Sequence, residues 1–149
     1  MIASGMGGPL TIRILQEGKE VADQLNALIL QPQSEICRVR KFLTENGYRI
    51  EQEDMVLEDG KYYPVMRVVH GTKEPYEEWE YLYGKRLLEA RHPVLLEFLK
   101  RELRIKESIL EQLAGRSGSE SARERAEEIC REREWIQKAL AQYETGGTI

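Results

Sequence analysis

Three glycines within four residues lie near the start of the chain, in a setting that suits contact with a ligand. They form the motif Gly5-Met6-Gly7-Gly8, which directly follows the short apolar segment 1–3. Glycine has no Cβ, so its backbone can approach a ligand closely, and open α/β sheets bind ligands at the carboxyl ends of their parallel strands. Two interpretations are open: a ligand-binding loop, or a tight strand-to-helix turn that binds nothing.

A second loop of this kind follows the next apolar segment. The run Ala27–Leu30 has no polar alternation, which is typical of a strand covered on both faces in a parallel sheet, and Gln31-Pro32 ends it. The carboxyl ends of parallel strands meet at one edge of the sheet. We therefore expect Gln31 and Pro32 to lie beside the glycine motif, and this shared edge is the candidate site.

Basic residues follow the second loop. Arg38, Arg40 and Lys41 lie close together in the helix expected there, and Arg38 and Lys41 share a face at i, i+3 spacing. Phosphate binding is one interpretation of this cluster, and an ordinary solvated surface is the other.

The cysteines and histidines show no arrangement typical of catalysis or metal binding. Cys37 and Cys130 are far apart and lack metal-ligand spacing, which excludes a disulfide scaffold and a zinc ribbon and suits a reducing cytosol. Arg38 beside Cys37 could lower the pKa of that thiol, but no second catalytic residue accompanies it, so we expect a structural thiol. His70 and His92 each lack a nearby nucleophile. No metal site is expected.

Helices and strands alternate over the first 70 residues. Helical spacing predicts a helix from about Pro9 to Glu17 and another over Glu35–Glu45, with Ser34 as the N-cap of the second helix. Together with the two apolar strands, this β-α-β-α order predicts a doubly wound α/β layer.

A β-hairpin is expected to close this α/β part. The extended segments 48–57 and 62–69 flank Glu58-Asp59-Gly60-Lys61, and Asp-Gly is typical of two-residue hairpin turns because both positions tolerate positive φ. Pro64 cannot donate a hydrogen bond to a strand ladder, so it predicts a sheet edge or a bulge.

The rest of the chain predicts a helical appendage. After a linker at 71–92 that holds a short helix, apolar residues recur at three- and four-residue spacing from Leu96 to Leu113 and again from Ala122 to Tyr143. The short break at 115–119 predicts an antiparallel helical hairpin over residues 93–145, packed like a coiled coil.

Composition narrows the class of protein. The 149 residues include 26 acidic and 22 basic side chains, a net charge of −4, which argues against binding nucleic acid through bulk charge but allows a local basic face. No apolar segment approaches the roughly 18 residues that a membrane-spanning helix needs, and no secretory signal is visible. We expect a cytoplasmic protein that does not contact a membrane.

Taken in order, these motifs resemble the bacterial tRNA (adenine(22)-N1)-methyltransferases, class I enzymes that use S-adenosylmethionine. The resemblance covers nearly the whole chain and is carried by Gly5-Met6-Gly7-Gly8, Leu28–Pro32, Val39–Tyr48, Glu58–Tyr63, Tyr83-Gly84 and Leu87-Leu88. It implies an α/β plus all-α fold: the second half of a Rossmann-like methyltransferase sheet at 1–70, ending in an antiparallel hairpin, and then a two-helix antiparallel coiled coil. The N-terminal half of that domain, with the main S-adenosylmethionine motif, has no match in this chain.

The resemblance also implies a reaction, namely methyl transfer from S-adenosylmethionine to N1 of adenine 22 of tRNA. Because N1 lies on the Watson–Crick edge, the base must be unpaired or extruded. The loops that hold the target base would be formed by Gly5, Met6, Gly7, Gly8, Gln31 and Pro32. The residues that bind RNA would be Arg38, Arg40, Lys41, Arg101, Arg104, Arg123 and Arg125. Since the cofactor site is incomplete, we expect the chain alone to bind S-adenosylmethionine poorly and to be inactive.

Two other functions are open. The chain could be a non-catalytic module whose helical hairpin binds tRNA or another protein, or a dimerisation unit. The first strand would lack a neighbour on one side, and unpaired strand edges and exposed apolar surface favour association with another chain. We therefore expect a homodimer through the truncated sheet edge.

Overall fold

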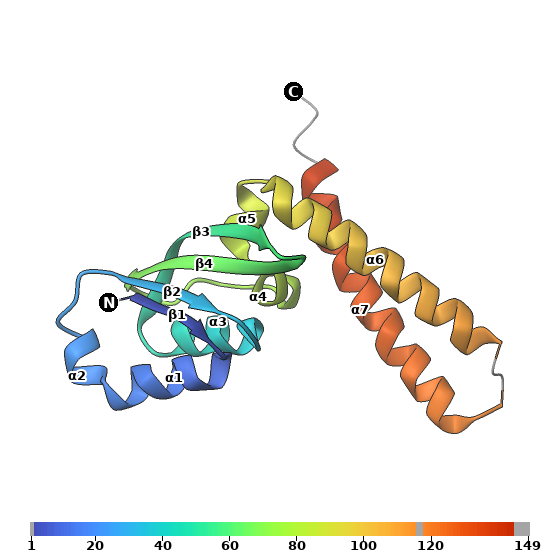
Figure 1. The fold of residues 1–149 in the computed structure, drawn as a ribbon, viewed down its shortest axis with the longest axis horizontal. Coiled ribbons are helices and arrows are strands. Elements are labelled where there is room, and N and C mark those ends of the chain that lie inside the picture. The colour runs from blue at the N-terminus through green and yellow to red at the C-terminus, as the bar shows by residue number, and fades with distance from the viewer. Residues whose placement is uncertain (1, 116–117, 145–149) are drawn as a thin grey trace.

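The computed structural model describes residues 2–115 and 118–144, which form a mixed sheet, helices packed on it and a pair of long helices (Figure 1). Three parts of the expected elements lie outside the described residues: Met1 of the first strand, residues 116–117 of the break and residue 145. In chain order the elements are β1 (Ile2–Met6), α1 (Gly8–Glu17), α2 (Lys19–Ala22), β2 (Leu28–Pro32), α3 (Ile36–Glu45), β3 (Tyr48–Glu58), β4 (Lys61–His70), α4 (Glu78–Tyr83), α5 (Lys85–Glu89), α6 (Pro93–Ala114) and α7 (Glu120–Glu144).

The strands pair in the order β1-β2-β4-β3. β1 and β2 are parallel, with Ala3 opposite Leu30, whereas β4 is antiparallel to both β2 and β3. Within the described residues β1 therefore lies at an edge of the sheet, next to the second apolar strand.

A two-residue turn joins β3 to β4. Asp59 and Gly60 have φ angles of 51° and 76°, and Glu58 faces Lys61 at the base of the turn. Positive φ at both central positions is the geometry that Asp-Gly favours. The local sequence is thus sufficient to predict this turn.

Pro64 lies in β4, an interior strand, but at a point where the described residues pair it with β3 alone, so the expected local sheet edge is present and the expected bulge is not. β4 runs between β2 and β3. Its pairs with β2 cover only Met66–Val68, so among the described residues the ladder with β2 stops short of Pro64. Proline is tolerated because no β2 residue needs its missing N–H. The register shifts instead between Ile50 and Gln52 of β3.

α1 and α3 cover one face of the sheet, and the main core lies between them and the strands. Its buried side chains are Ala3, Leu28, Leu30, Tyr48, Ile50, Met66 and Val68 from the strands and Ile12, Leu15, Val39 and Leu43 from the two helices. On the other face Ile2 is 76% exposed and Ile29 is only half-buried. Because Ile29 stays half-buried, the expected burial of β2 on both faces is only half achieved.

A second core joins the end of β3 to the helices α5, α6 and α7. Its buried residues are Met55, Leu87, Leu88, Leu95, Leu99, Ile136 and Ala139. α6 and α7 pack along each other (Figure 1). The Tyr143 hydroxyl donates to the His92 carbonyl at 2.7 Å, which ties the end of α7 to the start of α6.

Candidate functional site

The glycine motif and the Gln31-Pro32 segment lie side by side, as expected. Met6 is paired with Pro32 and Ser4 with Gln31 in the parallel ladder. One residue further, the Gln33 N–H donates to the Met6 carbonyl at 2.8 Å. The carboxyl ends of β1 and β2 therefore form one continuous edge.

The glycine motif is not a free loop. Gly5 and Met6 belong to β1, Gly7 is the N-cap of α1 and Gly8 is the first residue of α1. Gly5 has a φ of 72°, in the left-handed region, at the point where the register between β1 and β2 shifts. A residue with a Cβ rarely adopts this conformation, so the backbone itself requires glycine at position 5.

Packing against protein accounts for the other two glycines. A Cβ on Gly8 would lie 2.3 Å from the Ser34 carbonyl oxygen and 2.9 Å from that of Glu35, and a Cβ on Gly7 would lie 2.9 Å from the Ser34 Oγ. By contrast, nothing lies within 4 Å of the position of a Cβ on Gly5. The interpretation as a tight turn therefore explains Gly7 and Gly8, and space for a ligand remains beside Gly5.

Ser34 caps the neighbouring helix instead of its own, contrary to the prediction. The N-cap of α3 is Glu35, which has a φ of 46°, an uncommon left-handed conformation for a residue other than glycine. The Ser34 Oγ instead accepts the Gly8 N–H at 3.1 Å, which satisfies one of the free donors of the first turn of α1. The two loops at this edge are thereby fixed to each other.

Arg40 is buried, which contradicts its predicted contact with RNA. Its side chain is 1% exposed and that of Glu53 is 0% exposed, with Arg40 Nε 2.9 Å from Glu53 Oε1. The same guanidinium donates to the carbonyls of Tyr81 and Leu82 at 2.9 and 3.2 Å. The sequence alone could not reveal this role, because the partners lie 13 to 42 residues away. Arg40 joins α3, β3 and α4.

The other two members of the basic cluster, Arg38 and Lys41, differ in their solvent exposure and in their ion pairs. Lys41 Nζ lies 3.0 Å from Glu78, and this hydrogen bond raises the pKa of Lys41. Arg38 lies 3.8 Å from Glu35 with 64% of its side chain exposed. Arg38 is therefore the more accessible of the two.

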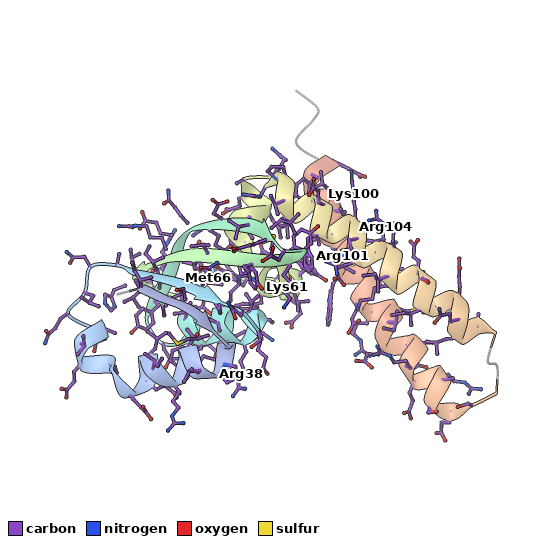
Figure 2. The ribbon with its side chains drawn as sticks, in the orientation of Figure 1. Arg38, Lys61, Met66, Lys100, Arg101 and Arg104 are labelled. Carbon is purple, nitrogen blue, oxygen red and sulfur yellow. The ribbon has the colours of Figure 1, made fainter. Side chains whose placement is uncertain are left out.

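The four predicted arginines of the long helices do not form one cluster. Arg101 and Arg104 lie near the middle of α6, with Arg101 closer to the sheet (Figure 2). Arg123 lies beside Leu113 at the far end of the helical pair, and Arg125 follows in α7, 3.2 Å from Glu128. At 1.5 Å per residue, Arg101 and Leu113 are about 18 Å apart along the helix axis. The arginines thus form two separate pairs.

A cavity of about 350 Å³ lies where the β3–β4 hairpin meets α6 and the loop after β2. We call it the hairpin–helix cavity, and it is lined by Gln33, Gly60, Lys61, Tyr62, Tyr63, Phe98 and Arg101. Of these residues, only Arg101 was predicted as a site residue. The run Lys61-Tyr62-Tyr63, a cation followed by two aromatic rings, is the sequence signal that could have indicated three of the others.

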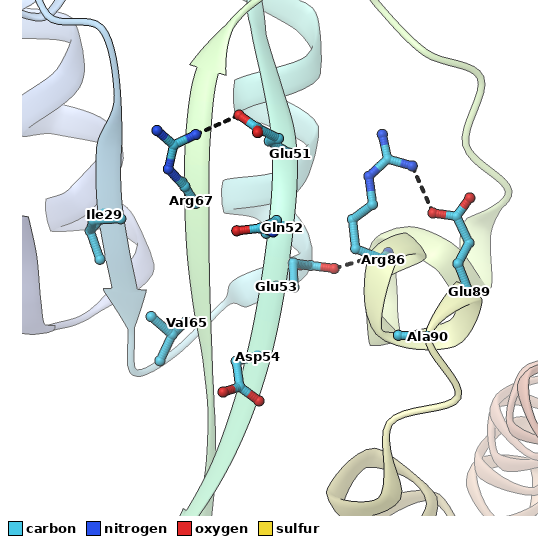
Figure 3. A pocket seen from close by; sticks show the side chains of 10 residues that line it. All are labelled: Ile29, Glu51, Gln52, Glu53, Asp54, Val65, Arg67, Arg86, Glu89 and Ala90. Atoms are coloured by element: carbon cyan, nitrogen blue, oxygen red, sulfur yellow. Dashed lines mark hydrogen bonds and ion pairs between the residues drawn. The ribbon is translucent and has the colours of Figure 1, made fainter.

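A larger concave surface of about 700 Å³ lies on the uncovered face of the sheet (Figure 3). Its floor includes Ile29 and Val65, and the ion pair of Arg67 with Glu51 lies beside them. Arg86 of α5 closes one side. This surface combines apolar groups with paired charges.

Two further kinds of chemistry, catalysis by a thiol and metal binding, can be compared with the geometry of the described residues. Burial raises the pKa of the Cys37 thiol, despite the opposing effect of the Lys41 charge, so Cys37 is a weak nucleophile. Within residues 2–115 and 118–144, no group of three or more His, Cys, Asp or Glu side chains could hold a metal ion. In the same residues no helix has the length and apolar character needed to cross a membrane.

Comparison with known proteins identifies the family. Residues 1–141 match TrmK, described as tRNA (adenine(22)-N(1))-methyltransferase. The chain belongs to the TrmK family. The tRNA (adenine(22)-N(1))-methyltransferase of Bacillus subtilis (strain 168) is 28% identical over 142 residues, which cover 92% of this chain and 60% of that protein. This chain therefore spans less than two thirds of the length of that TrmK relative.

Solved structures agree with this assignment. The crystal structure of the B. subtilis m1A22 tRNA methyltransferase TrmK has a TM-score of 0.76 and 28% identity, covering 93% of this chain and 62% of that one. Sp1610 of Streptococcus pneumoniae, described as a candidate tRNA (m1A22) methyltransferase and solved with S-adenosyl-L-methionine, has a TM-score of 0.77 and 26% identity over 93% of this chain and 58% of its own. A Streptococcus agalactiae protein of the NADB-Rossmann superfamily has a TM-score of 0.76, with 26% identity over 91% of this chain and 57% of its own. The sheet is therefore of the Rossmann-like type.

The family's cofactor, S-adenosylmethionine, fits only part of this arrangement. Ser34 fills the space that Gly7 and Gly8 leave, so these two glycines offer no cradle for a ligand. The space beside Gly5 is open, but in the described residues β1 has no strand on its outer side to form an opposite wall. These residues do not form a complete cofactor site by themselves.

Proposed function

We propose that this chain forms the adenine-binding and tRNA-binding part of an enzyme that methylates N1 of adenine 22 in tRNA. The observation that carries the proposal is the TrmK family match over residues 1–141. S-adenosylmethionine would supply the methyl group, and the groups that bind most of it would belong to the portion of the TrmK relatives that this chain does not match. A tRNA substrate implies a cytoplasmic location.

The target base is placed at the edge formed by Gly5, Met6, Gln31 and Pro32. The open space beside Gly5 supports this placement, because a flat base could approach the backbone there and its amino group could donate to a backbone carbonyl. Gln31 is half-buried at the same edge and offers an amide for a further hydrogen bond. Gly7 and Gly8 would act indirectly, by letting α1 and the β2–α3 loop hold this edge rigid.

Contacts with the body of the tRNA are assigned to the solvent-exposed basic residues. Arg38 and Lys41 would contact backbone close to the target base, and Arg101 and Arg104 would contact backbone near the middle of α6. Arg123 and Arg125, at the far end of the helical pair, would reach a more distant part of the tRNA. Phosphate contacts of this kind position the substrate without reading its sequence. We further propose three parts along the chain, residues 1–70, the linker 71–92 and the helical hairpin 93–145, with α6 and α7 packed as an antiparallel coiled coil.

The uncovered sheet face favours a second candidate, a non-catalytic RNA- or protein-binding module that forms a homodimer. β1 is an edge strand among the described residues, and its first residue, Ile2, is 76% exposed. Unpaired strand edges bind other strands. Sedimentation of the chain at micromolar concentration would show a dimer on this account, and deletion of the helical pair would leave the dimer intact.

A fusion protein tests the proposed function. The part of the B. subtilis relative that this chain does not match is joined to residues 1–149, and transfer of a labelled methyl group from S-adenosylmethionine to tRNA is measured. We expect the fusion to methylate tRNA and the chain alone to be inactive. A folded fusion that binds S-adenosylmethionine but transfers no methyl group would contradict the proposal.

A further inference from the structure

The hairpin–helix cavity combines positive charge with exposed aromatic surface. Its lining contains two cations, Lys61 and Arg101, and no carboxylate. Neither cation forms an ion pair among the described residues. Elsewhere the basic side chains Lys41, Arg67 and Arg86 are neutralised by carboxylates. Unpaired cations gathered in a concave surface attract an anion.

The aromatic rings give this cavity a defined geometry. Tyr62 packs against Phe98 with ring centroids 5.2 Å apart. The guanidinium carbon of Arg101 lies 5.6 Å from the centroid of the Tyr62 ring, so Tyr62 holds Arg101 in place through a cation–π contact. Tyr63 also lines the cavity, and its ring has no stacking partner among the described residues. One ring therefore orients a cation while the other is free to receive a flat ligand.

One residue, Gln33, links the cavity to the edge where we propose that the target base binds. Gln33 forms part of its wall, and the Gln33 N–H donates to the carbonyl of Met6 at 2.8 Å. Figure 2 shows Lys61 at the end of the hairpin and Arg101 on the adjacent part of α6. A polynucleotide that places one base beside Gly5 would therefore pass this cavity with a neighbouring nucleotide.

We propose that the hairpin–helix cavity binds a nucleotide adjacent to the target adenine, an inference that rests on the proposed function. Lys61 and Arg101 bind its phosphate, and the base stacks on Tyr63. Single-stranded RNA is commonly held by such a combination of aromatic stacking and backbone cations. Binding this neighbour keeps the strand open at the target, so that the Watson–Crick edge of the adenine stays accessible.

Equilibrium binding of fluorescently labelled tRNA to the full 149-residue chain tests this inference. We expect Lys61→Ala and Arg101→Ala each to weaken binding about tenfold and to reduce the slope of log K against log salt by about one. Tyr63→Leu should weaken binding about tenfold with the slope unchanged, because stacking is not ionic. The matched control is Lys100→Ala, which removes the same charge from the neighbouring, exposed position outside the cavity and should change binding less than about twofold.

Crosslinking gives an independent measurement. Ultraviolet irradiation of the chain with tRNA should attach nucleotides to the tryptic peptide 62–67, which contains both tyrosines. The inference is overturned if the cavity variants bind like the unaltered chain, if Lys100→Ala matches Arg101→Ala, or if the chain binds no tRNA. The proposed function fails separately, when a fusion protein with an unaltered cavity does not methylate tRNA.

Discussion

Replacing Arg40 by methionine should destabilise the protein by about 3–5 kcal/mol, because it leaves a buried carboxylate without its partner. The Arg40 and Glu53 side chains are 1% and 0% exposed and pair at 2.9 Å. Two main-chain carbonyls of α4 lose their donor as well. What remains for Glu53 is the Arg86 backbone N–H at 3.2 Å, which does not neutralise the charge.

Chemical unfolding in urea, followed by circular dichroism, measures this loss. For a chain of this size the melting temperature should also fall by roughly 10 °C. Arg13→Met is the matched control, since its pair with Glu17 is 71% and 68% exposed and should be worth less than about 1 kcal/mol. The double variant Arg40→Met/Glu53→Leu should be more stable than Arg40→Met, because it removes the buried, unpaired carboxylate of Glu53. An Arg40→Met variant as stable as Arg13→Met would refute the assignment of Arg40 as a structural residue.

Three further outcomes follow from the geometry of the site. Gly8→Ala should cost about 2–3 kcal/mol in urea unfolding, because its Cβ would meet a carbonyl oxygen at 2.3 Å, whereas Gly7→Ala meets only a hydroxyl that can rotate and should cost about 1 kcal/mol or less. Iodoacetamide at pH 8 should alkylate the exposed Cys130 before Cys37, since burial raises the pKa of Cys37 and lowers its thiolate fraction at that pH. The rate at Cys37, followed by mass spectrometry, should keep rising at more alkaline pH. Binding of tRNA should weaken steeply with salt, with a slope of about −0.7 to −0.9 per phosphate contacted, and a salt-independent affinity would argue against phosphate contacts.

The features that the sequence predicted correctly depend on short-range chemistry. The Asp59-Gly60 turn follows from the φ preferences of two adjacent residues. The adjacency of Met6 and Pro32 follows from the parallel pairing of two consecutive apolar strands. The helix after Pro9 was expected within one residue of its observed start at Gly8.

The features that it missed depend on contacts between distant segments. The side chain of Ser34 caps a helix 26 residues earlier in the chain, although its position before α3 favours a cap of that helix. Arg40 looks like a member of a basic cluster, but its charge is satisfied by β3 and α4. The hairpin–helix cavity forms from three segments that meet only in the fold. In each case a polar side chain finds its partner through tertiary packing, which spacing along the chain does not encode.

The position of the methyl group on tRNA tests the central claim most directly. The fusion protein is incubated with S-adenosylmethionine and a tRNA transcript. The positions at which reverse transcriptase stops on this RNA are then mapped, because a methyl group on N1 of adenine blocks the Watson–Crick edge. We predict a stop at adenine 22 and none when position 22 is guanine. A stop at another adenine, or methyl transfer that persists on the guanine transcript, would contradict the claim that this chain holds adenine 22 for methylation.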